Sequence, residues 1–266
     1  MIKKCVEQDK NIILNFLQRE PIYNTYIISD IEKYGFNQDY QDIYKQVNKQ
    51  NKVCGIFLRY YQNFILAGNA IELDYDEILL LLEKEITVIM AKDEIIKNLE
   101  IKLKDEKLKD EVTIDKKKMY CLEKKVHDEK NVECSYASIE DVDDIYDFIM
   151  TIPEFKNIYG EKAMISNRIL HQEGNHIFIK KDHQIIAHVN SAASTDKTSM
   201  IGGLCVRKEF RGQGYARKVL IAICSLICRE NKIPCIFIEN TKCSDSLLLE
   251  TGFEYYGQWW VIQRRR

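Results

Sequence analysis

The chain has 266 residues, of which 45% are hydrophobic and 30% are charged, and this is enough apolar material for two folded domains. Its 39 basic and 41 acidic residues nearly cancel to a net charge of -2. This balance argues against a nucleic-acid partner, and it means that any anion site has to be built from a local arrangement.

The nine cysteines predict reduced thiols and no disulfides. The N-terminus lacks the apolar core of a secretory signal, and Cys54, Cys224 and Cys228 fall inside apolar runs. Cysteines from Cys224 onward form no C-x-x-C pair, so we expect no metal site. No stretch approaches the roughly 18 consecutive apolar residues of a membrane span. We therefore expect a cytoplasmic protein without a membrane partner.

The first half alternates helical and strand patterns. We expect helices at 11–20, 26–34, 75–85 and 92–105, a strand at 86–91, and two strands within 52–69 that meet around Tyr61–Asn63. The run from Lys97 to Lys130 is heavily charged, with one short apolar interruption at Met119–Leu122. We place a boundary near Lys124–Asn131, which gives domains of residues 1–125 and 126–266.

After the charged run the order of elements restarts. A strand and a helix are expected within 132–150, where Ser138 is the N-cap and Asp141 completes a capping box. The other expected elements are a hairpin turning at Lys181–His183, strands at 198–206, 234–240 and 259–263, and helices at 215–231 and 243–252. Both halves thus predict α/β (α+β) domains with mixed sheets flanked by helices.

Two glycines, Gly212 and Gly214, stand between the strand at 198–206 and the helix that starts at Tyr215. A plain turn is one interpretation. The other is an anion site, because a helix start presents unpaired N–H groups and a positive dipole, and glycine lets a pyrophosphate approach them closely. Arg211 would add charge-assisted hydrogen bonds or fix the loop. A P-loop and a dinucleotide fingerprint are excluded, because Gly-Lys-Ser/Thr and a third glycine are missing.

This stretch resembles motif A of the GCN5-related N-acetyltransferase (GNAT) superfamily, Arg/Gln-x-x-Gly-x-Gly/Ala, at Arg211, Gly214 and Ala216. Lys208 replaces the customary proline. The resemblance runs from Val132 to the C-terminus and is closest to the FR47-like branch. It implies two GNAT-like domains, each a mixed, mostly antiparallel sheet with flanking helices. The first half lacks the motif, so it looks like the degenerate half of a tandem GNAT protein.

The resemblance also implies acetyl-CoA as the acyl donor. In the family the loop holds the pyrophosphate and the preceding strand pairs with the pantetheine arm. On the strand the corresponding residues are Leu204, Cys205 and Val206. In the loop they are Arg211, Gly212, Gln213, Gly214, Tyr215, Ala216 and Arg217. Asn240 and Ser244 would line the other side of the cofactor.

The catalytic residues match the family less well. Many relatives have a tyrosine, five residues before the phenylalanine of a Gly-Phe pair, that protonates the thiolate; Leu248 stands there. Glu239 is the candidate base, and the alternative is a solvent-facing carboxylate at a strand end. His188 could titrate near neutrality or be a hydrogen-bonded sheet histidine. Cys205 is expected to be a packed thiol, since nothing nearby lowers its pKa.

We expect an N-acetyltransferase that moves an acetyl group directly to the primary amine of a small molecule or peptide. The alternative is a catalytically inactive acyl-CoA-binding sensor or scaffold, and Leu248 is the feature that favours it. The sequence is compatible with a homodimer and fixes neither the acceptor nor the oligomeric state.

Overall fold

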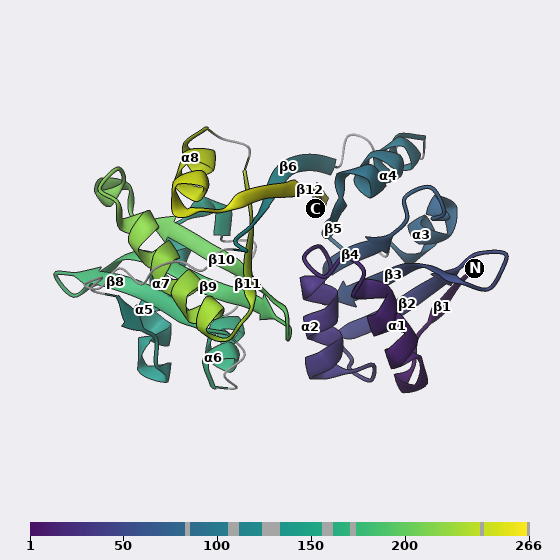
Figure 1. The fold of residues 1–266 in the computed structure, drawn as a ribbon, viewed down its shortest axis with the longest axis horizontal. Helices are drawn as coiled ribbons and strands as arrows, with labels where there is room; N and C mark the ends of the chain where they lie inside the picture. The colour runs from purple at the N-terminus through teal and green to yellow at the C-terminus, as the bar shows by residue number, and fades with distance from the viewer. Residues whose placement is uncertain are drawn as a thin grey trace. The chain divides into compact units, whose positions relative to one another are not determined.

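The computed structural model describes residues 1–82, 86–105, 112–123, 134–155, 162–170, 174–239 and 242–264 (Figure 1). The chain divides into two compact units. The first unit comprises Met1–Met119, Phe237–Thr241 and Tyr255–Arg266, and the second comprises Tyr120–Ile236 and Lys242–Glu254. The boundary predicted at Lys124–Asn131 falls within 124–133, outside the described residues, and stays a prediction.

The first unit is a mixed sheet with helices packed against it. Its strands are β1 (Ile2–Lys4), β2 (Gln41–Val47), β3 (Val53–Tyr60), β4 (Asn63–Gly68), β5 (Val88–Lys92), β6 (Val112–Cys121) and β12 (Glu254–Arg264), of which Tyr120, Cys121 and Glu254 belong to the second unit. Its helices are α1 (Lys10–Leu17), α2 (Thr25–Tyr34), α3 (Tyr75–Leu81) and α4 (Asp93–Asp105), with a 3-10 turn, η1 (Glu7–Asp9). The strand order is β1-β2-β3-β4-β5-β12-β6, and β4 pairs with β5 in parallel.

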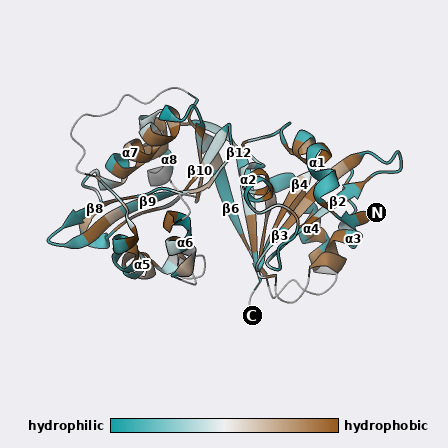
Figure 2. Ribbon diagram, turned by 90° about the horizontal axis from the view of Figure 1, so that it is seen from below, coloured by the Kyte–Doolittle hydropathy of each residue, from teal (hydrophilic) through white to brown (hydrophobic). Residues whose placement is uncertain are grey.

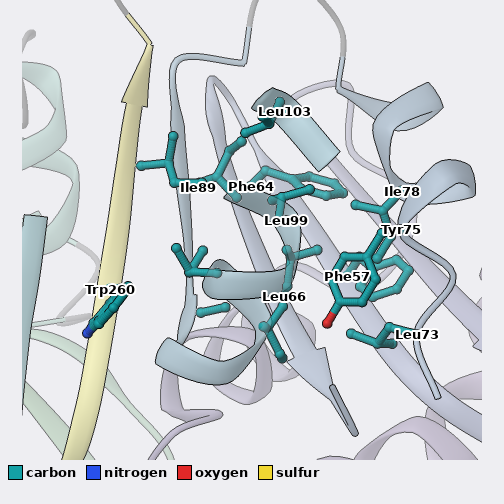
Figure 3. Packing of buried hydrophobic residues seen from close by; sticks show 14 of the residues in the cluster. Phe57, Phe64, Leu66, Leu73, Tyr75, Ile78, Ile89, Leu99, Leu103 and Trp260 are labelled. Atoms are coloured by element: carbon teal, nitrogen blue, oxygen red, sulfur yellow. The ribbon is translucent and has the colours of Figure 1, made fainter. Parts of the chain in front are cut away.

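A core in the first unit packs α3 and α4 against β3, β4, β5 and β12 (Figure 3). Phe57 and Phe64 come from neighbouring strands, Leu99 comes from α4, and Trp260 comes from β12. β12 is antiparallel to β5, from Trp259 opposite Lys92 to Gln263 opposite Val88. These C-terminal residues were predicted to belong to the second half, but they form part of the sheet of the first unit.

β6 lies inside the charged run, for which no strand was predicted. Two of its lysines lie over aromatic rings of the first unit: Lys116 Nζ lies 4.5 Å from the ring centroid of Trp260, and Lys117 Nζ lies 5.8 Å from that of Phe237. A lysine over an aromatic face keeps its charge and still covers apolar surface. The highly charged composition of this segment therefore did not predict the strand.

The second unit repeats the same kind of architecture. Its strands are β7 (Ser135–Tyr136), β8 (His176–Lys181), β9 (Gln184–Ser194), β10 (Thr198–Val206) and β11 (Ile233–Glu239), of which the last three residues belong to the first unit. Its helices are α5 (Val142–Met150), α6 (Ala163–Leu170), α7 (Tyr215–Arg229) and α8 (Lys242–Thr251), with 3-10 turns η3 (Ile139–Asp141), η4 (Pro153–Phe155) and η5 (Lys208–Phe210). The strand order is β11-β10-β9-β8-β7, and only the β10–β11 pairing among these strands is parallel.

Helices cover both faces of this sheet: Figure 2 shows α7 on one side of β8, β9 and β10 and α5 and α6 on the other. Two local predictions are confirmed. The Ser138 N–H donates to Asp141 Oδ2 at 3.0 Å, and the hairpin between β8 and β9 turns at Asp182 and His183, both at positive φ. The predicted fold class, mixed sheets with flanking helices, is also confirmed. Within the described part of the chain, no helix combines the length and the apolar character needed to cross a membrane.

Candidate functional site

The predicted glycine loop connects β10 to α7. Gly212 and Gly214 have φ angles of 74° and 81°, which residues with a side chain rarely adopt. A Cβ atom placed on either glycine would meet no atom within 4 Å. The backbone conformation, and not internal crowding, therefore requires glycine here, and the loop presents its main chain to open space.

The start of α7 is suited to an anion. Gly214 is the N-cap, so no side chain caps the helix, and the first turn contains no acidic residue. The first N–H groups of a helix have no partner within it, and they carry the positive end of the dipole. Lys181 Nζ and Lys218 Nζ lie 5.0 and 5.3 Å from the ring centroid of Tyr215, and they add positive charge beside the loop.

Side chains of the loop fix its own backbone. Arg211 Nε donates to the carbonyl oxygen of Val206 at 3.2 Å, and Gln213 Nε2 donates to that of Glu209, also at 3.2 Å. Of the two roles predicted for Arg211, the structure shows the second, in which the side chain ties the loop to the end of β10.

The end of β10 leaves part of its backbone unpaired on one edge. Its parallel pairing with β11 runs from Thr198 opposite Ile233 to Ile201 opposite Ile236 and goes no further among the described residues. On the other edge, Arg207 N–H donates to Ile186 O at 2.8 Å. Because hydrogen-bonding direction alternates along an antiparallel strand, the N–H of Cys205 points toward β9, whereas that of Val206 points away.

β10 also bulges beside β9. Gly202 lies opposite Asn190 and Cys205 opposite His188, so Gly203 and Leu204 together face one residue of β9. Gly203 has a φ of 58°, and a Cβ atom there would lie 2.7 Å from Asn190 Oδ1. The bulge thus depends on glycine, and it displaces the strand just where its outer edge becomes unpaired.

Two buried histidines support this bulge. His188 Nδ1 lies 3.0 Å from the carbonyl oxygen of Gly203, and His188 Nε2 lies 2.9 Å from His176 Nδ1. The side chains of His188 and His176 are 0% and 2% exposed. Burial lowers the pKa of His188 to about 4, and burial also holds the pKa of His176 well below its usual value. Both rings are therefore neutral near pH 7.

Residues 139–245 match the acetyltransferase (GNAT) family. This segment is a GNAT domain. The resemblance inferred from motif A is thereby confirmed for the second half of the chain, and the glycine loop and the end of β10 lie inside the matched residues. The FR47-like assignment stays a prediction.

Solved structures extend the likeness to both halves. A GCN5-related N-acetyltransferase-like protein from Streptococcus suis aligns with a TM-score of 0.65 and 14% identity, over 98% of this chain and 100% of its own. A Drosophila protein aligns with a TM-score of 0.71 and 14% identity, over 99% of this chain and 98% of its own. A tandem GNAT protein from the clavulanic acid biosynthesis pathway aligns with a TM-score of 0.61 and 11% identity, over 99% of this chain and 98% of its own. At these identities the likeness shows the fold. A comparison with curated proteins gave no match.

Of the other predicted GNAT site residues, the structure describes Glu239 and the backbone of Ser244. Glu239 ends β11 at an exposed position in the first unit, and its role as a base stays a prediction. Asn240 lies outside the described residues. Ser244 lies in α8, but its side chain is outside the described set. The parts of the chain that the structure describes contain no group of three or more His, Cys, Asp or Glu residues able to hold a metal ion.

The position at which many family members have a tyrosine is occupied by a buried hydrophobic residue. Leu248 is 1% exposed on α8, and its carbonyl oxygen accepts a hydrogen bond from Phe253 N–H at 3.0 Å. A different tyrosine, which was not predicted, contacts α8: Tyr120, near the end of β6, donates from its hydroxyl to Asp245 Oδ1 at 2.7 Å. The bulge in β10 was not predicted either, although Gly202–Gly203 inside a strand was an available signal.

Proposed function

We propose that the GNAT domain binds acetyl-CoA and transfers its acetyl group to the primary amine of a small molecule or peptide. The observation that carries this proposal is the open glycine loop at the uncapped start of α7, directly after a strand end with an unpaired edge. These features suit a ligand with a diphosphate and an extended amide-containing arm. The match of residues 139–245 to an acetyltransferase family supports the same conclusion.

In this proposal the loop backbone from Arg211 to Arg217 binds the pyrophosphate, and backbone N–H groups at the end of β10, those of Leu204 and Val206, are the donors available to the acyl arm and its thioester carbonyl. The side chain of Arg211 acts by holding the loop. Acetyl-CoA supplies an activated acyl carbon when bound. The neutral amine forms the new C–N bond there as the C–S bond breaks, the nitrogen loses a proton, and the thiolate leaves with the electron pair of the broken bond.

Loss of the proton from the attacking amine requires a base. Glu239 is proposed as the base, directly or through water. Leu248 cannot donate a proton, and this observation favours the alternative function, a protein that binds acyl-CoA and does not turn it over. Such a sensor would use the same loop.

Calorimetric titration with CoA and acetyl-CoA, combined with an assay of thiol release over a panel of amines, separates the two. The enzyme is expected to release thiol faster with at least one amine than without. Binding without turnover on any amine supports the sensor. Absence of binding of either ligand to the intact protein contradicts both functions.

A further inference from the structure

The carbonyl of Gly203 and the N–H of Leu204 belong to one peptide group. This group is planar and trans, so its C=O and N–H point in opposite directions. Any group that holds the Gly203 oxygen therefore also sets the direction of the Leu204 N–H. His188 Nδ1 holds that oxygen at 3.0 Å, and Cys205 Sγ donates to it as well at 3.3 Å.

The histidine pair has one arrangement of protons. A carbonyl oxygen only accepts, so His188 carries its proton on Nδ1, and in the neutral ring Nε2 is an acceptor. His176 must then donate to it from Nδ1. His176 Nε2 is buried and has no hydrogen-bond partner among the described residues, so the series of hydrogen bonds starts at His176 and ends at the Gly203 carbonyl.

The direction of the series follows from the sheet. His188 lies opposite Phe178 on β8 and opposite Cys205 on β10, and residues directly opposite in an antiparallel pair share a face. Phe178 and Cys205 both belong to the core that packs with α5 and α6. The Gly203 oxygen is therefore turned toward β9 and the α5–α6 face. The Leu204 N–H points away from both, toward the edge that β11 leaves unpaired.

We propose that His188, with its tautomer set by His176, is a positioning residue that aims the Leu204 N–H at the thioester carbonyl. This inference rests on the proposed function, because it names the donor that polarises the acyl group. It assigns a role to two buried histidines that are neutral and do not reach the reacting atoms themselves. It also explains why Gly203 has no side chain, since a Cβ atom would lie 3.1 Å from His188 Cε1.

The variants are His188→Leu, which removes the donor, and His188→Asn, whose amide nitrogen can take the place of Nδ1. Thr195→Val is the matched control, because Thr195 Oγ1 makes buried hydrogen bonds at the other end of β10. We expect kcat of His188→Leu to fall roughly 10- to 100-fold, somewhat less than the loss of an oxyanion-hole donor, with little change in the KM for acetyl-CoA. His188→Asn should recover most of kcat, and Thr195→Val should keep it.

Two measurements do not depend on turnover. Histidine ¹⁵N spectra of the intact protein near pH 7 should show both rings protonated at Nδ1. The Leu204 amide resonance should shift with acetyl-CoA more than with CoA, which lacks the carbonyl, and this difference should vanish in His188→Leu.

An Nε2-protonated His188 overturns the proposal, and so does a His188→Leu variant that keeps kcat, or a His188→Asn variant that recovers nothing. If the wild type binds neither ligand, the proposed function fails, and the role for the Leu204 N–H fails with it. If it binds both without turnover, the proposed enzyme fails while the Leu204 resonance still decides the inference.

Discussion

The two units have the same order of elements but differ where a strand meets the next helix. In each, three antiparallel pairings are followed by one parallel pairing, β4 with β5 in the first unit and β10 with β11 in the second. The connection after β4 leads to the short helix α3, and the connection after β10 leads to the 15-residue helix α7. The fold alone therefore does not account for the proposed anion site.

The N-termini of α3 and α7 differ in the groups that an anionic ligand would meet. In the first unit Asp74 caps α3, accepting a hydrogen bond from Glu77 N–H at 3.1 Å, and Asp76 and Glu77 place further negative charge in the first turn. In the second unit the equivalent position is Gly214, which has no side chain to occupy those N–H groups. A carboxylate at the first helix start takes the place that an anionic ligand would need, so we expect binding only at the second.

The two sheets also differ in the strand pairing next to the helix start. β3 and β4 pair from Gly55 opposite Gly68 to Tyr60 opposite Asn63 without a shift in register, whereas β9 and β10 bulge at Gly203. The second unit also contains the buried histidines, and the sequence has no histidine before His127. The first unit thus has a regular β3–β4 pairing and a capped helix, and the second has a bulge in the corresponding β9–β10 pairing and an open helix start.

The largest predicted difference between the units is their response to acid. The unfolded pKa of His188 is 6.5 and the folded value is about 4, so only the unfolded state takes up a proton between these limits. The stability of the second unit is therefore full above pH 6.5 and falls by about 3 kcal/mol toward pH 4. His176 adds to this loss, because burial, His188 and Arg168 of α6 all lower its pKa.

Two probes can separate the units. Both tryptophans, Trp259 and Trp260, lie in β12 of the first unit, so their fluorescence reports that unit, and far-UV circular dichroism reports both. In urea titrations from pH 7 to 4.5, an early transition seen by dichroism should move to lower urea while the fluorescence midpoint changes little. His188→Asn should reduce the shift. Midpoints that fall together by both probes would contradict the assignment to the second unit.

The next effect is on ligand affinity. Gly214→Ala forces a side chain into a left-handed conformation at the helix start, so we expect the loop amides to move and CoA affinity to fall roughly 10- to 100-fold, the equivalent of one or two charge-assisted hydrogen bonds. Gly35→Ala is the matched control: Gly35 ends α2 in the first unit at a φ of 65°, and its added Cβ meets only ordinary contact. Equal affinities of the two variants, measured by calorimetry, would count against the loop.

Local signals predicted much of the fold. The capping box at Ser138, the hairpin turn at Asp182–His183 and the helix after Gly214 depend on residues close in sequence, and each is present. One element that was missed, β6, depends on distant partners. β6 is stabilised by rings of Trp260 and Phe237, which lie more than a hundred residues away along the chain.

In the candidate site, too, the features set by neighbouring residues could be predicted and those set by distant residues could not. The loop could be predicted because glycines, a preceding strand and a following helix form one continuous stretch. The histidine pair could not, because it requires the register of β8, β9 and β10 and the extra residue at Gly203. His188 was interpreted as either a titrating group or a sheet histidine, and only the contact with the Gly203 carbonyl shows what it holds.

A smaller effect is expected from Arg211→Ala. Its guanidinium holds the Val206 carbonyl, so the change loosens the link between β10 and the loop without removing an amide from the site. We expect CoA affinity to fall roughly 10-fold, in line with the loss of one charged hydrogen bond. Gln213→Ala, which removes a neutral hydrogen bond to Glu209 in the same loop, should have less effect. A larger loss in Gln213→Ala than in Arg211→Ala would refute this order.

The smallest effect tests the first unit. Asp74→Ala removes the cap of α3, and this should lower the free energy of unfolding by about 1 kcal/mol, measured by the tryptophan-monitored urea midpoint. CoA affinity should not change, because the ligand is expected at α7. Asp74→Asn keeps an oxygen that can accept from Glu77 N–H, so it should retain most of the stability. Asp76 and Glu77 keep negative charge in the first turn of α3 in Asp74→Ala, so a second CoA site in the calorimetry of this variant would contradict the expectation.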